Sequence, residues 1–216
     1  MSDLPLAIII AARSTPASRV SFQAAQIADQ ELRTLGFPVK FLRGVKATRP
    51  FVEKTLSSSE GGRFVIYAGH GEPDAFLGNE PLQRHLYSKL RPIDLDNMAL
   101  LKDDIVYAIS CHTLAELGQK APARAFIGFN SRVRLDATDW NDDAIPDFVE
   151  CFLEPIEVLS EGGTVSEAVQ SFKDISNAFI QKAGINGADA DYVARMKHNI
   201  EAIGYSGDPF SRVISP

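Results

Sequence analysis

A histidine and a cysteine occupy matching positions in this sequence, each shortly after an apolar run. His70 lies between Gly69 and Gly71, and Cys111 follows Ser110. A free thiol has a pKa of about 8.5, so little thiolate exists at neutral pH unless a neighbouring base takes the proton. An imidazole beside a thiol therefore makes a nucleophile that can attack a carbonyl carbon.

Attack on a carbonyl also requires hydrogen-bond donors for the oxyanion that develops on its oxygen. We expect the backbone N–H groups of Gly71 and Cys111 to be these donors, and the missing side chain of Gly71 to leave room for the substrate carbonyl. Gly69 is expected to allow a sharp exit from the strand. A short helix, expected to begin at Cys111 and to end at Lys120, would place its positive N-terminus at the thiol. A histidine and a cysteine at strand ends are also common as packed structural residues, and the pattern alone leaves both interpretations open.

Apolar runs alternate with segments of helical periodicity, which is typical of an α/β protein. The runs are short and continuous, as in parallel strands that are buried on both faces. We therefore predict a mostly parallel, doubly wound sheet with helices on both faces. The expected strands span residues 6–12, 38–45, 64–68, 105–109 and 125–129. The expected helices span residues 15–36, 48–60, 82–90, 111–120, 146–161, 164–183 and 191–203.

This class of fold also predicts where a ligand would bind. In an open parallel sheet, ligands sit beyond the carboxyl ends of the strands. His70 and Cys111 follow the expected strands at residues 64–68 and 105–109. If these strands are neighbours, the two side chains emerge side by side at that edge of the sheet.

The composition fits one ordinary domain over residues 1–216, since 45% of the residues are hydrophobic. A net charge of −6 and a pI near 5.2 disfavour binding to nucleic acid or to an anionic membrane. The apolar run at residues 6–12 is too short to span a bilayer, and no basic segment precedes it as a signal peptide requires. Two cysteines, Cys111 and Cys151, make no disulfide scaffold, so we predict a cytoplasmic protein with reduced thiols.

Three strings carry a resemblance to a known family. Tyr67-Ala-Gly-His-Gly71 and Ile109-Ser-Cys-His-Thr113 resemble the two catalytic motifs of caspase-like cysteine peptidases, the group that holds caspases, metacaspases, gingipains, separases and CHAT domains. Gly207-Asp208-Pro209, expected before a final apolar strand, is similar to the Gly-Asp-Pro near the end of many gingipain and CHAT sequences. Residues 152–178 look like the CHAT helix pair. The resemblance covers residues 4–214, with sharp motifs only at the three strings.

The resemblance implies a caspase-hemoglobinase-like fold and hydrolysis of peptide bonds through a thioester acyl-enzyme. Cys111 would be the nucleophile, His70 the general base and proton donor, and Gly71 together with Cys111 the oxyanion site. It implies a protein or peptide substrate and no cofactor. For so small a domain it implies control by an activating protein partner, a loop rearrangement or self-cleavage. Regulated proteolysis, as in cell-death or defence signalling, is the biological role that such a resemblance suggests.

Departures from the family pattern leave the specificity open. Ile109 stands where metacaspases carry an acid that binds a basic P1 side chain, and the caspase string Gln-Ala-Cys-x-Gly is absent. Arg13, after the first expected strand, is a candidate for binding an acidic P1 side chain, or an ordinary solvated residue. Asp139 lies in an acidic loop at residues 136–143, which is a candidate for binding a basic P1 side chain or calcium, or serves only to keep the loop soluble.

Two other functions compete with a peptidase. A catalytically silent caspase-like interaction module would share the fold, although it has no need of both His70 and Cys111. A nucleotide-binding domain needs a glycine-rich turn after its first strand, and residues 11–16 contain no glycine. His112 beside Cys111 matches no common zinc spacing, so no metal site is predicted. Cys151 is expected to pack in the core.

Overall fold

Six strands form one sheet in the order β2 (Val39–Arg43), β1 (Ala7–Ala11), β3 (Phe64–Ala68), β6 (Ile105–Ile109), β7 (Ala125–Phe129) and β8 (Ile203–Gly207). The strands from β2 to β7 run parallel, and β8 pairs antiparallel with β7 at one edge. The computed structural model describes residues 4–12, 18–59, 61–78, 91–135, 144–186 and 190–214. The sheet confirms the predicted α/β class with a mostly parallel sheet, and its strand order is consistent with a caspase-like α/β fold.

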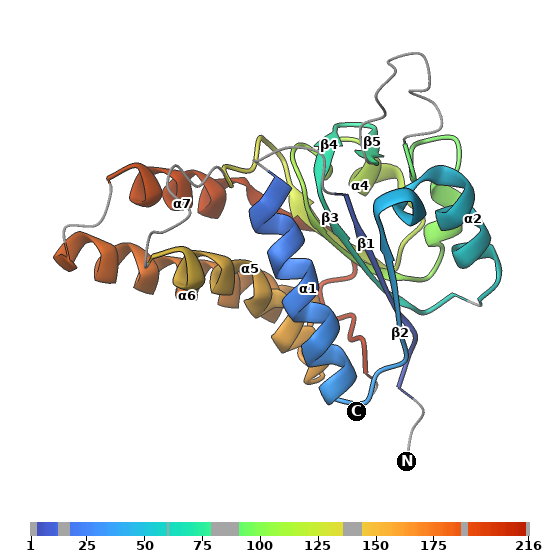
Figure 1. Ribbon diagram of the computed structural model, residues 1–216, viewed down its shortest axis with the longest axis horizontal. Helices are drawn as coiled ribbons and strands as arrows, with labels where there is room; N and C mark the ends of the chain where they lie inside the picture. Colours follow the sequence, from blue (N-terminus) through green and yellow to red (C-terminus); the bar gives the residue numbers. More distant parts are fainter. Residues whose placement is uncertain are drawn as a thin grey trace.

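Helices cover both faces of the sheet, which explains why its central strands are apolar throughout. All residues of β1, β3, β6 and β7 are buried. Successive residues of a strand point to opposite faces, so Ile9 packs into one core layer and Ile8 into the other. The first layer lies against α1 (Ser18–Thr34), α5 (Ala144–Ser160), α6 (Val165–Asn186) and α7 (Ala190–Ala202) (Figure 1). The second lies against the 3-10 helices η1 (Gly44–Ala47) and η3 (Met98–Leu101), and against α2 (Arg49–Ser57) and α4 (Leu117–Lys120).

Local signals in the sequence fix the ends of two long helices. Gly36 has a φ of +89°, and the N–H of Phe37 donates to the carbonyl oxygen of Leu32 at 2.9 Å, which closes the C-terminus of α1. Thr164 and Glu167 form the capping box of α6. The Glu167 carboxylate accepts from the Thr164 N–H at 2.7 Å, and the Thr164 hydroxyl accepts from the Glu167 N–H at 3.2 Å.

A two-stranded hairpin and one edge strand of the main sheet differ from the sequence prediction. His70 is not in a turn but begins a hairpin of β4 (His70–Glu72) and β5 (Ala75–Leu77). Residues 203–207, expected at a helix end and a following loop, form the edge strand β8. β4 and β8 contain glycine and polar residues, and β5 has only three residues, so no long apolar run marks these strands in the sequence. The helix expected at residues 82–90 lies outside the described residues.

The Gly-Asp-Pro string follows the last strand, whereas the sequence analysis expected it before one. Gly207 ends β8 with a φ of +84°, which glycine adopts without strain. The Asp208 carboxylate accepts from the N–H of Phe210 and from the hydroxyl of Ser211, both at 3.0 Å. The carbonyl oxygens of Pro209 and Ser211 accept from the first N–H groups of α6. The string is therefore a turn that ties the C-terminal segment to the start of α6.

Candidate active site

His70 and Cys111 lie at equivalent positions beyond two neighbouring strands. β3 pairs with β6 in the register Ala68↔Ile109, and His70 and Cys111 each follow two residues later. The condition for the two side chains to emerge at one edge, that these strands are neighbours, is therefore met. Gly69 extends their contact, since its N–H lies 3.3 Å from the carbonyl oxygen of Ile109. Both His70 and Cys111 are partly exposed.

One small cavity collects the residues at this edge of the sheet. It has a volume of about 40 Å³, and His70 and Cys111 line it together with Ser18, Ser21, Gly69, Ser110, Arg132, Val133 and Leu135. A cavity of this size has room for a few water molecules or for a small polar group such as a carbonyl. The thiol residue and the imidazole residue therefore border the same space.

The backbone around Cys111 is held against the loop that follows β7. The Cys111 thiol donates to the carbonyl oxygen of Val133 at 3.7 Å. The next N–H, that of His112, donates to the carbonyl oxygen of Ser131 at 2.9 Å. His112 itself has a φ of +59°, which is uncommon for a residue with a side chain. These contacts fix the direction of the chain as it leaves the sheet at Cys111.

Helix α7 fixes the same loop from its other side. The Nε2 atom of His198 lies 3.2 Å from the Ser131 hydroxyl and 2.8 Å from the carbonyl oxygen of Arg132. Asn199 is fully buried; it accepts from the N–H of Arg134 at 2.9 Å and donates to the Arg134 carbonyl oxygen at 3.1 Å. No pattern in the sequence predicts this pair, because the contact joins segments 65 residues apart and no motif marks it.

A buried tyrosine fastens the hairpin that carries His70. The Tyr67 hydroxyl lies 2.6 Å from the carbonyl oxygen of His70 and 2.5 Å from that of Leu77, and its one proton is shared between these two acceptors. Its ring stacks on Phe76 with the ring centroids 4.0 Å apart. Burial raises the pKa of Tyr67 above its usual value, so the hydroxyl remains a donor at neutral pH.

The glycines beside His70 allow close packing, which corrects the expectation for Gly69. A Cβ on Gly71 would lie 2.2 Å from the Ser110 Oγ and 2.6 Å from the Cys111 carbonyl oxygen. The packing of the hairpin against the turn at Cys111 therefore requires a glycine at this position. A Cβ on Gly69 would lie 2.7 Å from the Tyr67 hydroxyl, and Gly69 has no positive φ, so tight packing explains it better than a sharp exit from the strand.

The helix expected at the thiol is a second correction. Residues 111–116 form consecutive turns, and α4 begins only at Leu117. The helix that reaches the cavity is instead α1, whose Ser18 and Ser21 line it. A helix N-terminus carries positive partial charge and favours a nearby anion. The positive partial charge that was expected from a helix beginning at Cys111 is therefore supplied by the N-terminus of α1.

Ser110 is a cavity residue to which the sequence analysis gave no role. Its side chain is fully buried and lines the cavity. Its Oγ has no hydrogen-bond partner among the described residues. A buried hydroxyl without a partner costs free energy, so it favours any polar group that enters the cavity. The sequence shows a serine before the cysteine but not the direction of its side chain.

The remaining candidates fall into three groups. Arg13 and Asp139, with the rest of the loop at residues 136–143, lie outside the described residues. Arg132, which was not a specificity candidate, places an exposed cationic residue at the cavity. Cys151 packs in the core as predicted, and burial raises the pKa of its thiol to about 12.

No protein-family model matches the chain, and no curated protein matches it either. Within the described ranges, no group of three or more His, Cys, Asp or Glu residues is placed to hold a metal ion. Nor does any helix in the described part of the chain have the length and apolar character needed to cross a membrane. The candidate site therefore depends on its geometry and on the resemblance of its motifs.

Proposed function

We propose that the protein is a cysteine endopeptidase that hydrolyses peptide bonds with a His70–Cys111 dyad. The observation that carries the proposal is that these residues follow register-paired strands and line one cavity. A partly exposed cysteine and a histidine at the ligand-binding edge of a parallel sheet are the groups that acyl transfer requires. The strand order and the motif resemblance support the same class.

In the proposed reaction, His70 takes the proton of the Cys111 thiol, and the thiolate attacks the carbonyl carbon of the scissile bond. The N–H groups of Gly71 and Cys111 stabilise the oxyanion of the tetrahedral intermediate. As the C–N bond breaks, the imidazolium of His70 gives its proton to the leaving amine, and a thioester remains on Cys111. His70 then deprotonates a water that attacks the thioester, which releases the carboxylic acid and restores the thiol.

We propose that an activating protein partner, a loop rearrangement or self-cleavage controls the site, as the resemblance implies for so small a domain. The cavity of about 40 Å³ admits a small polar group such as a carbonyl. We infer that the substrate is an extended protein or peptide segment that lies along the rim, near the exposed Arg132. Two free cysteines are compatible with the cytoplasm as the proposed location. Regulated proteolysis, such as cell-death or defence signalling, is the proposed role.

Thiol labelling and peptide cleavage test the proposal together. A peptidyl thiol trap should label the wild-type protein at Cys111, located by mass spectrometry, and the protein should cleave members of a diverse peptide library. Cys111→Ala should abolish both signals. His70→Ala should slow cleavage by about 10²–10⁴-fold, the usual contribution of a general acid–base. Cys151→Ala removes the other, buried thiol as a matched control and should change neither signal.

A catalytically silent binding module is the alternative that the small cavity favours. Neither labelling nor cleavage, with candidate partner proteins present or absent, would support that alternative. Cleavage that survives Cys111→Ala would exclude Cys111 as the nucleophile. Labelling of Cys151 in the folded protein would contradict its burial.

A further inference from the structure

Strand β2 forms one edge of the main sheet. Among the strands that the structure describes, it pairs with β1 only and stands at the end of the strand order. Figure 1 shows β2 between α1 and α2. The outer side of an edge strand presents N–H and C=O groups that can pair with an extended segment of another chain.

The pairing with β1 shows which backbone groups of β2 point to the open side. The N–H of Ala7 donates to the carbonyl oxygen of Pro38 at 2.9 Å, and Ala7 is aligned with Val39. In a parallel pair, only alternate residues of a strand bond to the neighbouring strand. Every second residue from Pro38 onward therefore faces β1, whereas Val39, Phe41 and Arg43 direct their N–H groups outward.

A groove of about 540 Å³ runs along this open edge. Four residues of α1 line one side, and Phe41, Arg43, Val45 and Lys46 line the other. The two lining residues from β2 are thus two of the residues whose backbone points outward. One outward acceptor, the carbonyl oxygen of Val39, already accepts from the Arg33 side chain at 3.2 Å. The backbone of Phe41 offers a further donor and a further acceptor to a segment that lies in the groove.

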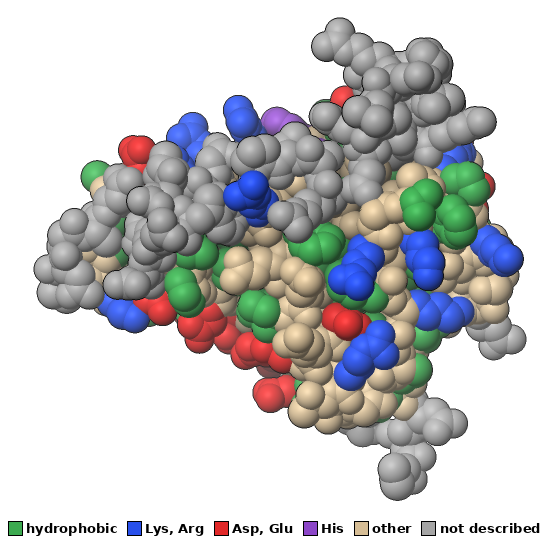
Figure 2. Space-filling view, in the orientation of Figure 1, with side chains coloured by type: hydrophobic (Ala, Val, Ile, Leu, Met, Phe, Trp, Pro, Cys, Tyr) green, Lys and Arg blue, Asp and Glu red, His purple; other side chains and the backbone are tan. Residues whose placement is uncertain are grey.

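The charge at this edge is positive. Lys40, Arg43 and Lys46 are exposed, and none of the three has an ion-pair partner among the residues that the structure describes. Asp29, in the lining of the groove, is bound to Arg33 at 2.8 Å, so these two charges cancel. Figure 2 shows lysines and arginines gathered over β2 and α2. The edge therefore attracts anions, although the whole chain has a net charge of −6.

Apolar surface lies beside these charges. Val45 lines the groove and is 70% exposed. Phe41 is partly exposed there, and the guanidinium carbon of Arg43 lies 5.7 Å from the centre of its ring. A ligand that uses the whole edge must therefore combine backbone donors and acceptors, negative charge and some apolar side chains.

We propose that the β2 edge binds an extended, acidic segment of another protein, which adds a strand to the sheet. The backbone of the segment pairs with the outward groups of Phe41 and Arg43. Its carboxylates pair with Lys40, Arg43 and Lys46, and its apolar side chains pack on Phe41 and Val45. The groove shares no lining residue with the cavity at Cys111, so the proposal does not depend on the peptidase activity.

Two other occupants fit this edge less well. Pairing of β2 with β2 of a second copy would bring the lysines and arginines of both copies together, and like charges on paired strands are destabilising. A nucleic acid has the required negative charge but lacks the regular N–H and C=O groups of a strand, so it would leave the backbone of Phe41 unpaired.

Fluorescence anisotropy with a labelled peptide tests the proposal on the full chain at physiological salt. The probe is Glu-Val-Val-Glu-Glu-Val-Val-Glu, which presents acidic and apolar side chains on both faces when it is extended. It should bind the wild-type protein, whereas the same peptide with lysine in place of glutamate should not. N-methyl groups on the four central residues keep the charge but block both strand edges, so they should weaken binding at least tenfold.

Arg43→Glu and Lys46→Glu should each weaken binding of the probe by about fivefold, because an attraction becomes a repulsion at an exposed position. Circular dichroism checks that both variants fold. Lys102→Glu is the matched control, because it makes the same change of charge at an exposed position between η3 and β6, outside the groove. It should leave binding unchanged, and so should Cys111→Ala.

Equal binding of the N-methylated peptide would overturn the proposal, since charge alone would then explain the attraction. Absence of binding to the probe, equal weakening by Lys102→Glu, or full displacement of the probe by an equal concentration of a single-stranded oligonucleotide would overturn it as well. A wild-type protein that is dimeric in sedimentation, with a monomeric Arg43→Glu variant, would assign the edge to a second copy instead.

Discussion

Gly71 lies where the hairpin that carries His70 touches the turn that carries Cys111. The position of its absent Cβ is already occupied by the Ser110 Oγ, the Cys111 carbonyl oxygen and a methyl group of Thr113, all within 2.7 Å. The lack of space for a Cβ therefore explains why a glycine follows the histidine. It allows the two segments that hold the proposed dyad to approach more closely than any side chain permits.

We expect Gly71→Ala to destabilise the protein and to slow labelling of Cys111. The added methyl would meet a backbone carbonyl that no rotamer change can move, and such overpacking typically costs about 1–3 kcal/mol. Urea denaturation measures the free energy of unfolding, and a thiol trap measures the labelling rate. Gly204→Ala is the control, because its methyl would lie 3.2 Å from a movable Leu114 side chain. Normal stability and labelling of Gly71→Ala would show that the close approach is dispensable.

At the scale of elements, a side chain of helix α7 pairs with the backbone of the loop that follows β7. The side-chain amide of Asn199 bonds both the N–H and the carbonyl oxygen of Arg134, as a backbone partner would. The loop between β7 and α5 supplies Val133, which contacts the Cys111 thiol, and Arg132, which lines the cavity. One wall of the candidate active site is therefore held by a helix that comes late in the sequence.

Asn199→Ala should lower the free energy of unfolding by about 1–3 kcal/mol for each buried backbone group that it leaves unpaired. It should also speed alkylation of Cys111, because the loop that covers the thiol loses an anchor. Asn199→Asp places an unpaired carboxylate in this fully buried position, against the Arg134 carbonyl oxygen, so at neutral pH it should destabilise the protein at least as much as Asn199→Ala. Asn177→Ala, at an exposed position of α6, should change neither quantity. An alkylation rate that is identical in all four proteins would refute this role of Asn199.

The same scale explains what the sequence could and could not predict. Residues 64–68 and 105–109 form continuous apolar runs, and the observed strands β3 and β6 have the same bounds. In a parallel sheet the carboxyl ends of neighbouring strands lie at the same edge, and this rule predicts that His70 and Cys111 lie close together. The direction of Ser110 and the contact of Asn199 with Arg134 arise from packing between distant segments. No local pattern encodes such contacts, so they became visible only in three dimensions.

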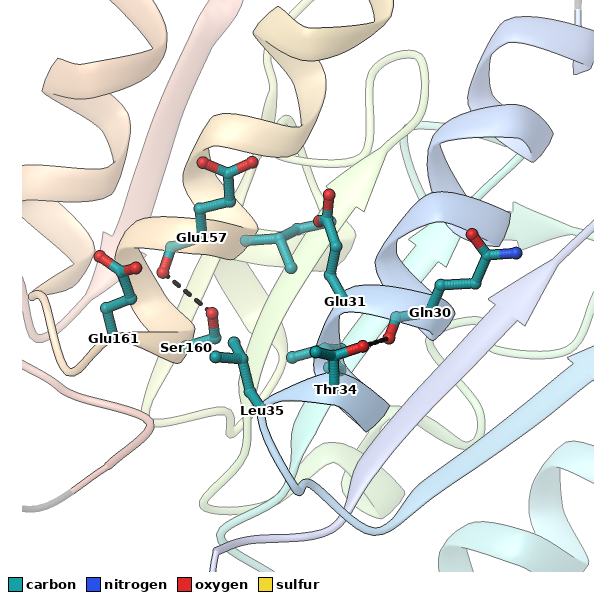
Figure 3. Close-up of a pocket in the computed structure, with 9 residues that line it drawn as sticks. Gln30, Glu31, Thr34, Leu35, Glu157, Ser160 and Glu161 are labelled. Carbon is teal, nitrogen blue, oxygen red and sulfur yellow. Dashed lines mark hydrogen bonds between the residues drawn. The ribbon is translucent and has the colours of Figure 1, made fainter.

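Across the whole molecule, the net charge of −6 is unevenly distributed. Acidic side chains gather beside α1 and below α5 and α6, whereas lysines and arginines gather over β2 and α2 (Figure 2). The two ends of α1 also differ in the partial charge that they carry. The N-terminus of α1 faces the cavity that Cys111 lines. The C-termini of α1 and α5 lie at the pocket lined by Glu31 and Glu157 (Figure 3). One end of α1 thus favours anions and the other favours cations.

This charge distribution makes stability depend on pH. Burial raises the pKa of Glu31, and burial, Glu31 and the carboxylates of Glu154, Glu150 and Glu161 raise that of Glu157. A carboxyl group whose pKa is higher in the folded state contributes stability that is fully present below its unfolded value, here 4.5, and is lost as the pH rises through the folded value. At neutral pH these two groups therefore oppose folding.

The double variant Glu31→Gln/Glu157→Gln should accordingly be more stable than the wild-type protein at neutral pH, and the difference should vanish as the pH falls to 4.5 and below. The pKa values of Glu53 and Glu167 are lowered, so these two groups make the protein less stable as the pH falls. Both proteins contain them, so the difference in stability between the two proteins reports on Glu31 and Glu157 alone. Urea denaturation from neutral pH down to pH 4.5 and below measures the free energy of unfolding of both proteins. Glu201→Gln, at an exposed position of α7, is the control. A difference that grows on acidification would mean that these carboxylates stabilise the fold, contrary to the raised pKa values.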